Sequence, residues 1–388
     1  MQTDSPKEAT QTSPGTIGVP KETKPQEGRV GITSDGVRTL SALGVKVCVE
    51  HDAGMLSGFS DSDYLFAGAT VMPNVEALYR VSDMIVKVKE PTPEEYPLLE
   101  LLRGKALFTY LHLAGVDPEL TRILLRNEVT AIAYETVTGE TGGRTTFPLL
   151  APMSRIAGTQ AMRTALARLP KEARAKATVV ILGCGGVGEA ALLEALGQGV
   201  ERIHIFELSG VRRDALRTFC ADYPEVCIHP LELLDGPTGR EVLGRADIIL
   251  SGVLCPGGAE APKVLTQKHF RIMREGAYIV DVAIDQGGST AWSRVTKPGE
   301  TFVRGKRKLV FSCAPNIPGS TVPKEATLAR TEATLPYIQL LGKYVLEHGM
   351  WSGTHYALRD HPGLRAGLQT FRGHLVNSAV ASKHQLFA

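Results

Sequence analysis

The stretch A-T-V-V-I-L-G-C-G-G-V-G-E-A-A, residues 177–191, decides the fold of this chain. Its first six residues are mostly β-branched or apolar and favour a buried strand. Three glycines follow in the spacing G-x-G-x-x-G, and small residues after Glu189 favour a helix. A strand that runs through such glycines into a helix is typical of a dinucleotide-binding βαβ unit. We therefore predict an α/β protein with a mostly parallel sheet.

The three glycines have separate roles in such a unit. Gly183 permits a tight turn, Gly185 lets backbone N–H groups meet a pyrophosphate, and Gly188 lets helix and strand pack closely. Gly186 and Val187 lie between them and open the helix, whose N-terminus carries a partial positive charge. We therefore expect this loop to bind a dinucleotide cofactor.

A second predicted strand, R-I-H-I-F-E over residues 202–207, ends in Glu207, about 20 residues beyond the glycines. A carboxylate at this point accepts hydrogen bonds from the adenosine ribose and repels a 2′-phosphate, so it favours NAD over NADP. Arg212 and Arg213 follow closely and weaken that preference.

Predicted strands alternate with helices along the 388 residues, which indicates βαβ units in two domains. The other strands are expected at residues 16–19, 45–50, 82–89, 106–111, 129–134, 226–231, 247–251, 278–282 and 308–312. Residues 326–346 have helical spacing, with a bend or break expected at Pro336. The segment 351–388 is too short to form a domain alone, so we expect it to complete the first one. The predicted fold class is α/β, with two Rossmann-like, mostly parallel sheets flanked by helices and a discontinuous first domain.

Composition argues against several classes of protein. Lys and Arg total 43 and Asp and Glu 41, a net charge of +2, which gives no support to nucleic-acid or membrane-surface binding. No apolar stretch approaches the ~20 residues of a membrane helix. Residues 1–15 are polar and typical of a solvated tail rather than a signal peptide. Six cysteines without a C-x-x-C pair indicate reduced thiols, so we expect a soluble, cytoplasmic protein.

Four ionisable residues stand in apolar surroundings, where a charge is costly unless it has a partner or a function. These are Arg29 in E-G-R-V-G-I-T, Lys89 in I-V-K-V-K-E-P, His112 in F-T-Y-L-H-L-A and Asp285 in I-V-D-V-A-I-D-Q-G-G. A guanidinium binds a carboxylate, an ammonium polarises a keto or imino group, and imidazole and carboxyl groups exchange protons. The set suits a small amino or keto acid that exchanges a hydride with a nicotinamide.

Each of these four residues also has a structural interpretation. Arg29 and Lys89 fit solvated surface charges, His112 fits a hydrogen-bonded core histidine, and Asp285 fits a turn. The residues alone therefore leave open whether the four converge on one site.

The chain resembles the alanine dehydrogenase family, which shares its fold with the NAD-binding part of proton-translocating transhydrogenase. The resemblance runs from Ile17 to about Ala381. It rests on ordered segments: I-G-V-P-K-E-T-K, E-G-R-V-G-I-T, V-K-V-K-E-P, L-F-T-Y-L-H-L-A, A-I-A-Y-E-T-V, P-L-L-A-P-M-S, V-V-I-L-G-C-G-G-V-G, I-V-D-V-A-I-D-Q-G-G and A-T-L-P-Y-I.

The resemblance implies roles for residues that match the family's motifs. It implies catalysis by His112 and Asp285, and substrate binding by Arg29, Lys89 and Asn316. It adds NAD contacts at Ser154, Val253 and Leu254. It also implies a substrate domain of residues 1–147 and 325–388, an inserted NAD-binding domain of residues 148–324, and a homo-oligomer, either a hexamer or a dimer.

The implied activity is NAD-dependent oxidative deamination of L-alanine to pyruvate and ammonium, and the reverse reaction. Two alternatives stay open: an NAD(P)-dependent dehydrogenase or imine reductase for another amino or imino acid, and a non-catalytic NAD-binding module. The chain departs from the family pattern at Arg155, Thr159, Arg330 and Glu332. These departures spare the four chemical residues and predict altered surroundings of the cleft.

Overall fold

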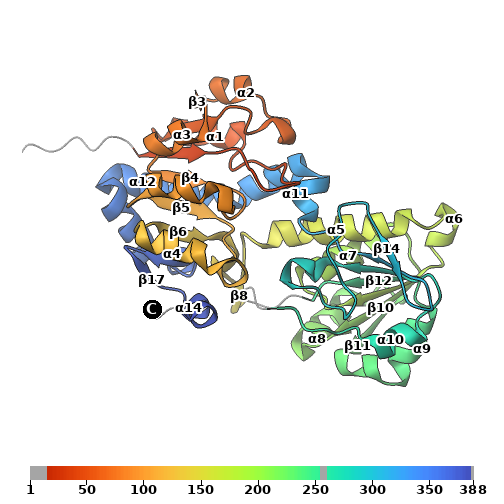
Figure 1. The fold of residues 1–388 in the computed structure, drawn as a ribbon. Coiled ribbons are helices and arrows are strands. Elements are labelled where there is room, and N and C mark those ends of the chain that lie inside the picture. The colour runs from red at the N-terminus through yellow and green to blue at the C-terminus, as the bar shows by residue number, and fades with distance from the viewer. Residues whose placement is uncertain (1–14, 254–259, 386–388) are drawn as a thin grey trace, which may run out of the picture.

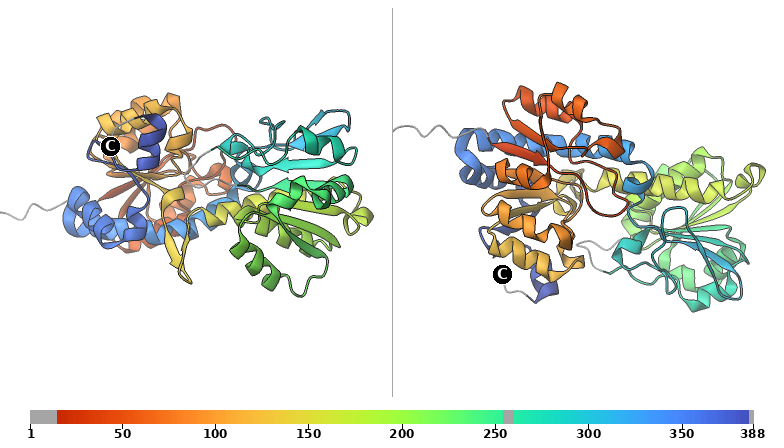
Figure 2. Two further views of the ribbon diagram at one scale, coloured as in Figure 1. Left: turned by 90° about the horizontal axis from the view of Figure 1, so that it is seen from below. Right: turned by 45° about the horizontal axis from the view of Figure 1, so that its top comes forward.

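The computed structural model describes residues 15–253 and 260–385, and within them the chain forms two lobes (Figure 1). Each lobe contains a sheet with helices on both faces, and the lobes stay distinct in both further views (Figure 2). The predicted α/β class with two mostly parallel sheets is therefore confirmed. The expected NAD contact Leu254 and the predicted tail, apart from Gly15, lie outside the described residues.

The first lobe contains, within the described residues, an eight-stranded sheet in the order β17-β16-β6-β5-β4-β1-β2-β3. Its strands are β1 (Thr16–Val19), β2 (Lys46–Glu50), β3 (Thr70–Met72), β4 (Met84–Val86), β5 (Ala106–Thr109), β6 (Thr130–Ala133), β16 (Leu368–Phe371) and β17 (His374–Leu375). The strands from β6 to β3 are parallel, whereas β16 pairs antiparallel with β6 and β17. Because β16 and β17 come from the C-terminal segment, this domain is discontinuous, as predicted.

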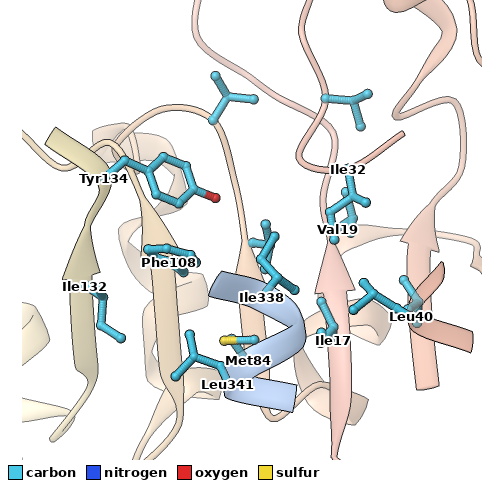
Figure 3. Close-up of a cluster of buried hydrophobic side chains, with 14 of the residues drawn as sticks. Ile17, Val19, Ile32, Leu40, Met84, Phe108, Ile132, Tyr134, Ile338 and Leu341 are labelled. Atoms are coloured by element: carbon cyan, nitrogen blue, oxygen red, sulfur yellow. The ribbon is translucent and has the colours of Figure 1, made fainter. Parts of the chain in front are cut away.

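Helices cover both faces of this sheet. The helical elements of the lobe are α1 (Ser34–Ala42), η1 (Met55–Ser57), α2 (Asp61–Phe66), α3 (Val75–Val81), η2 (Pro93–Leu102), η3 (Leu113–Gly115), α4 (Pro118–Arg126), η4 (Tyr134–Thr136), α12 (Pro323–Asp360), α13 (Pro362–Arg365) and α14 (Ser378–His384). Met84 and Phe108 point to the face covered by α1 and α12 (Figure 3). Ile85 and Leu107, one position along each strand, point to the face covered by α3 and α4, because side chains alternate along a strand.

Helix α12 differs from its prediction. Residues 326–346 are helical as expected, but the helix continues through Pro336, and its non-helical backbone lies at Gly349 (φ 75°). A proline removes one backbone N–H donor, whereas a positive φ ends the regular helix and favours glycine. The prediction of a break at Pro336 is therefore wrong. The uninterrupted first part lets Ile338 and Leu341 reach the core of the first lobe (Figure 3).

The second lobe contains, within the described residues, a seven-stranded sheet in the order β11-β10-β9-β12-β13-β15-β14. Its strands are β9 (Thr178–Leu182), β10 (Arg202–Glu207), β11 (Val226–Pro230), β12 (Ile248–Ser251), β13 (Tyr278–Asp281), β14 (Phe302–Arg304) and β15 (Leu309–Ser312). All neighbours are parallel except β14 and β15. A short hairpin of β7 (Gly139–Thr141) and β8 (Arg144–Thr146) precedes this lobe.

Helices also cover both faces of the second sheet. They are α5 (Ala151–Ala167), α6 (Lys171–Arg174), α7 (Gly186–Gly197), α8 (Gly210–Phe219), η5 (Leu231–Asp235), α9 (Pro237–Arg245), α10 (Gln267–Ile272), η7 (Val282–Gln286) and α11 (Ile317–Thr321). Val179 and Ile181 pack with α5, α7 and α8, whereas Val180 and Leu182 pack with α9 and α10. Helices α5 and α11 lie beside the junction of the two lobes (Figure 1).

Two further expectations concern cysteines and membranes. The five cysteines in the described part of the chain are all free. Among the described helices, none has both the length and the apolar character needed to cross a bilayer.

Candidate active site

The predicted site residues follow the carboxyl ends of parallel strands in both lobes. In the first sheet, the segments after β1, β4 and β5 carry Arg29, Lys89 and His112. In the second, the segments after β13 and β15 carry Asp285 and Asn316. Ligands of open α/β sheets bind outside this edge, so sequence position and topology agree on one region in each lobe.

Arg29 joins the two lobes. Its buried guanidinium donates a 2.7 Å hydrogen bond from Nη2 to Oδ1 of Asn316, the N-cap residue of α11. Nε and Nη2 also donate to the carboxylate of Glu27, at 2.7 and 2.5 Å. The edge of the guanidinium formed by Nε and Nη2 is therefore engaged. Nη1 contacts the sulfur of Met153, a weak acceptor, at 3.0 Å and is the nitrogen best placed to bind a substrate carboxylate.

Glu27 holds Arg29 from two residues away. Burial alone would raise the pKa of Glu27, but the charge and hydrogen bonds of Arg29 outweigh burial and lower that pKa to about 2. Glu27 is therefore ionised at neutral pH, and the two residues form a buried salt bridge. Oε2 of Glu27 also accepts a hydrogen bond from Nδ2 of Asn316 at 3.0 Å, so the asparagine amide contacts both charged partners.

Lys89 has a different environment from Lys87. Lys87 is fully buried, bonds Glu95 at 2.6 Å and lies 3.6 Å from Glu22. Lys89 is also buried, but within the described residues no hydrogen bond or ion pair involves its ammonium. Its backbone is held by Glu22, which accepts hydrogen bonds from the N–H groups of Val88 and Lys89. Lys87 is therefore structural, and the Lys89 ammonium remains available for a ligand.

His112 follows β5 in a left-handed backbone conformation with φ 46°. The carboxylate of Glu135 accepts hydrogen bonds from the N–H groups of Leu111 and His112, at 3.2 and 2.6 Å, and lies 3.6 Å from Nδ1 of His112. The ring of Tyr110 stacks on the imidazole, with 5.9 Å between centroids. Because the side chain of His112 is nevertheless 39% exposed, it is both held and accessible to a ligand.

Two aspartates follow β13 in different environments. Asp281 is buried, and its carboxylate accepts hydrogen bonds from the N–H groups of Ala283 and Ser289, so it supports the turn. Asp285 lies in η7 and is exposed, and within the described residues no hydrogen bond or ion pair involves its carboxylate. No such contact joins Asp285 to His112. The structure therefore brings Arg29 and Asn316 together and places the predicted catalytic pair on separate lobes.

The glycine loop fits a dinucleotide. A Cβ at Gly188 would lie 2.2 Å from the carbonyl oxygen of Gly183, and one at Gly158 would lie 2.0 Å from that of Val187. Helix α7 thus packs directly on the end of β9 and on α5. At Gly185, the N-cap residue of α7, an added Cβ would meet nothing within 4 Å. The N-terminus of this 12-residue helix therefore opens onto free space that an anion can enter.

Other predicted NAD contacts border this loop. A Cβ at Gly186 would lie 3.1 Å from the Cβ of Ser154, on α5. A Cβ at Gly183, where φ is 74°, would lie 3.2 Å from Cγ2 of Val253. The loop, α5 and the segment after β12 therefore lie side by side, and the roles of Ser154 and Val253 as NAD contacts stay predictions.

Glu207 is buried at the end of β10. Its carboxylate accepts hydrogen bonds from the N–H groups of Cys184 and Ser209, at 2.7 and 2.9 Å. Arg212 forms an ion pair with Glu189 and donates to the carbonyl oxygen of Cys184 at 2.8 Å. The residues present thus fit NAD, with a fixed carboxylate beside the loop and an arginine that already has partners.

Three carboxylates of the site were not singled out from the sequence: Glu22, Glu27 and Glu135. Glu27 stands in the same E-G-R stretch as Arg29, and the cost of burying a lone guanidinium is a reason to search for an acid there. Glu135 follows β6 much as His112 follows β5, so the rule of strand ends also applies to it. No comparable local signal marks Glu22, whose partners follow β4.

Comparison with known proteins gives the family. The model "Alanine dehydrogenase/PNT, N-terminal domain" matches residues 18–157, and "Alanine dehydrogenase/PNT, C-terminal domain" matches residues 156–378. This chain belongs to the alanine dehydrogenase/PNT family. The alanine dehydrogenase of Bacillus subtilis (strain 168) is 38% identical over 384 residues, which cover 94% of this chain and 93% of that protein.

One solved structure agrees with membership of the alanine dehydrogenase/PNT family, and a second shares the fold. An L-alanine dehydrogenase superposes with a TM-score of 0.81 at 36% identity, covering 95% of this chain and 99% of that one. A transhydrogenase from Sinorhizobium meliloti has a TM-score of 0.74 at 22% identity, covering 94% and 99%, and this likeness shows the shared fold alone. The division of the chain at 147/148 and 324/325 stays a prediction.

Proposed function

We propose that this chain is an NAD-dependent alanine dehydrogenase. It would convert L-alanine, NAD⁺ and water to pyruvate, ammonium, NADH and a proton, and catalyse the reverse reaction. The observation that supports this most is the Arg29–Asn316 hydrogen bond, because it joins the strand ends that carry Lys89 and His112 to the lobe that carries the glycine loop. The 38% identity to the Bacillus subtilis alanine dehydrogenase supports the choice of substrate.

Two cations of the first lobe would bind the substrate. Arg29 is fixed by Glu27 and Asn316, and its Nη1 would receive the substrate carboxylate. Lys89 would donate from its ammonium to the keto oxygen of pyruvate, which makes the carbonyl carbon more electrophilic. Because the buried carboxylate of Glu27 already fixes the Arg29 guanidinium, that side chain loses little freedom when the substrate binds.

The second lobe would hold NAD. The pyrophosphate would lie at the N-terminus of α7 beside Gly185, with Ser154 and Val253 bordering the loop and Glu207 at the adenosine ribose. Bound NAD would supply the hydride acceptor for the substrate Cα. Since Arg212 is paired with Glu189, we infer a preference for NAD over NADP.

His112 and Asp285 would handle the protons. Water attacks the imino carbon of the oxidised substrate while His112 takes a proton from the water, and the product is a carbinolamine. Asp285, whose carboxylate has no partner in the described structure, would accept hydrogen bonds from the nitrogen as it leaves as ammonia. For this departure His112 first returns its proton to the amino nitrogen and then accepts the proton of the carbinolamine hydroxyl, so that the C–N bond breaks as the C=O bond of pyruvate forms. The ammonia takes that proton and becomes ammonium, and pyruvate remains bound to Arg29 and Lys89. This requires the second lobe to bring Asp285 to the first.

The test is an absorbance assay of NADH with purified protein. We expect NADH formation from L-alanine and NAD⁺, and NADH consumption with pyruvate and ammonium. Turnover with a different amino acid in a panel, and none with alanine or pyruvate, would replace the substrate. Failure of every amino acid and every keto acid with ammonium would overturn the proposal.

A His112→Asn variant separates an enzyme from a binding module. Asparagine tolerates the left-handed backbone of this position, so the fold should persist. An enzyme would lose turnover by at least ~10²-fold and keep its NADH affinity, measured by fluorescence.

We further propose that the protein is cytoplasmic and forms a homo-oligomer, a dimer or hexamer. Light scattering would test the oligomeric state.

A further inference from the structure

The segment Gly28–Gly31, which carries Arg29, is fastened to helix α12. The N–H group of Val30 donates to Oγ1 of Thr327 at 3.2 Å. The carbonyl oxygen of Gly28 accepts a 2.7 Å bond from Ser57, whose hydroxyl also contacts that of Thr327 at 2.8 Å. The first turns of α12 therefore determine where this segment lies.

Arg330 makes the next contacts of α12 with the same segment. Its side chain is fully buried, and Nη2 donates to the carbonyl oxygens of Val30 and Gly31, the latter at 2.6 Å. Its Cζ lies 5.9 Å from the ring centre of Tyr134. Within the described residues no carboxylate pairs with Arg330, and its Nε and Nη1 have no hydrogen-bond partner. Burying a guanidinium without a counterion costs folding free energy. The presence of Arg330 at this position therefore points to a role other than stabilising the fold.

Gly31 shows how tightly the segment is enclosed. A Cβ at Gly31 would lie 2.3 Å from the carbonyl oxygen of Val86, at the end of β4. The backbone after Arg29 is thus enclosed between the first sheet on one side and Arg330 on the other. Without the Arg330 contacts, only the bonds of Ser57 and Thr327 would hold this backbone from the side of α12, so the position of Arg29 would be less closely fixed.

We propose that Arg330 is a positioning residue for substrate binding: by holding the Val30 and Gly31 carbonyls, it fixes Arg29 where the substrate carboxylate binds. This role rests on the proposed function. Asn316, which accepts a hydrogen bond from the Arg29 side chain, is separated from α12 only by the short helix α11. The segment that returns from the second lobe therefore contacts both the side chain of Arg29, through Asn316, and the backbone beside it, through Arg330. Misplacement by about 1 Å can cost ~10²-fold, and because Arg29 binds the substrate carboxylate before and during the reaction, we expect the cost in KM rather than in kcat.

Three variants test the proposal. Arg330→Met removes both carbonyl contacts and the buried charge while keeping an extended side chain. Arg330→Lys keeps the charge and one donor. Thr334→Val is the matched control, because Thr334 lies one turn along α12, is fully buried, and has a hydroxyl without a partner within the described residues. The measurements are kcat and KM for pyruvate, the NADH dissociation constant, Tm, and hydrogen exchange of the backbone over residues 28–32.

For Arg330→Met we expect KM for pyruvate to rise at least tenfold, kcat to change less than threefold, and NADH affinity to stay as in the unaltered protein. Hydrogen exchange over residues 28–32 should accelerate because the contacts of Arg330 with this backbone are lost. Tm can move in either direction, because the substitution also removes a destabilising buried charge. Arg330→Lys should have a KM and an exchange rate between those of the unaltered protein and Arg330→Met. Thr334→Val should match the unaltered protein in both quantities.

The outcomes separate the two proposals. An Arg330→Met protein with KM within twofold of the unaltered protein, or with unchanged exchange over residues 28–32, overturns the positioning role even if Tm falls. Equal effects of Thr334→Val on KM also overturn it, because they would show a general disturbance of α12. Absence of turnover in the unaltered protein overturns the proposed function instead, and the exchange experiment still tests Arg330.

Discussion

The two lobes build their halves of the site by different means. The second lobe uses one contiguous loop, in which glycines let the backbone of α7 and β9 approach within contact distance. The first lobe uses side chains from three strand ends: the Arg29 guanidinium is fixed by the buried carboxylate of Glu27, while Glu135 and Glu22 bond the backbone of His112 and Lys89. The comparison teaches that backbone shape forms the proposed cofactor site, whereas carboxylates that hold side chains or their backbone form the proposed substrate site. The two should therefore respond differently to substitution.

The largest effect is expected from Arg29→Met in the first lobe. The change removes the proposed carboxylate ligand and leaves Glu27 buried without its counterion, so we expect kcat/KM to fall at least ~10³-fold and stability to fall by about 3–5 kcal/mol. NADH affinity should persist, since the glycine loop is untouched. Assays of turnover, NADH fluorescence and chemical denaturation measure the three quantities.

The double variant Arg29→Met with Glu27→Met is the control for this prediction. Removing both partners of a buried pair restores much of the stability that removal of one costs. We expect the double variant to recover stability but not activity. Recovery of activity would show that Arg29 serves the fold rather than the substrate.

The next effect concerns the second lobe and pairs two glycine substitutions. In Gly188→Ala the new methyl group would lie 2.2 Å from a backbone oxygen that cannot move aside, so we expect a loss of about 3 kcal/mol or more and little NADH binding. In Gly185→Ala the methyl group meets nothing within 4 Å and φ is −74°, so Tm should hardly change. NADH affinity should nevertheless fall about tenfold, because the methyl group occupies the space proposed for the pyrophosphate. Unchanged affinity in Gly185→Ala would place the cofactor elsewhere.

The same difference between the lobes explains which parts of the candidate site can be predicted from the sequence. The glycine loop and Glu207 are local, so their spacing predicts the second lobe's loop, which the structure confirms in shape. The position of Arg29 depends on Arg330, which bonds a carbonyl group 300 residues earlier in the chain, and no spacing rule connects two such residues. Charges in apolar stretches drew attention to Arg29, Lys89 and His112, but not to the acids that hold them.

Helix α12 gives the corresponding lesson for the fold. Its apolar spacing predicts the helix, yet Pro336 predicted a bend or a break, and the structure has its break at Gly349 instead. One lost N–H donor at Pro336 is tolerated because Ile338 and Leu341 pack in the core just beyond it. Packing across the sheet outweighed the local propensity, and only the tertiary structure shows that contact.

Acid should weaken the Glu27–Arg29 ion pair of the first lobe. The pKa of Glu27 is lowered from 4.5 to about 2, so its contribution to stability is complete above pH 4.5 and is lost as pH falls towards 2. By linkage the loss amounts to up to about 3 kcal/mol. Denaturation between pH 5 and 2 measures it, with the Arg29 and Glu27 double variant as reference: the stability of the unaltered protein relative to the double variant should fall as pH falls. A constant difference would contradict the lowered pKa.

The smallest effect is expected from a pair with the same geometry in the other lobe. Arg163 on α5 and Glu194 on α7 share two parallel hydrogen bonds of 3.0 Å, as Arg29 and Glu27 share two, but the Arg163 side chain is 52% exposed. Water and salt screen such a pair, so Arg163→Met should cost less than about 1 kcal/mol and lower Tm by only a few degrees. The cost should vanish in 1 M salt, whereas that of Arg29→Met should persist there because its partner is buried. If both substitutions cost the same in high salt, burial would not be what distinguishes the two lobes.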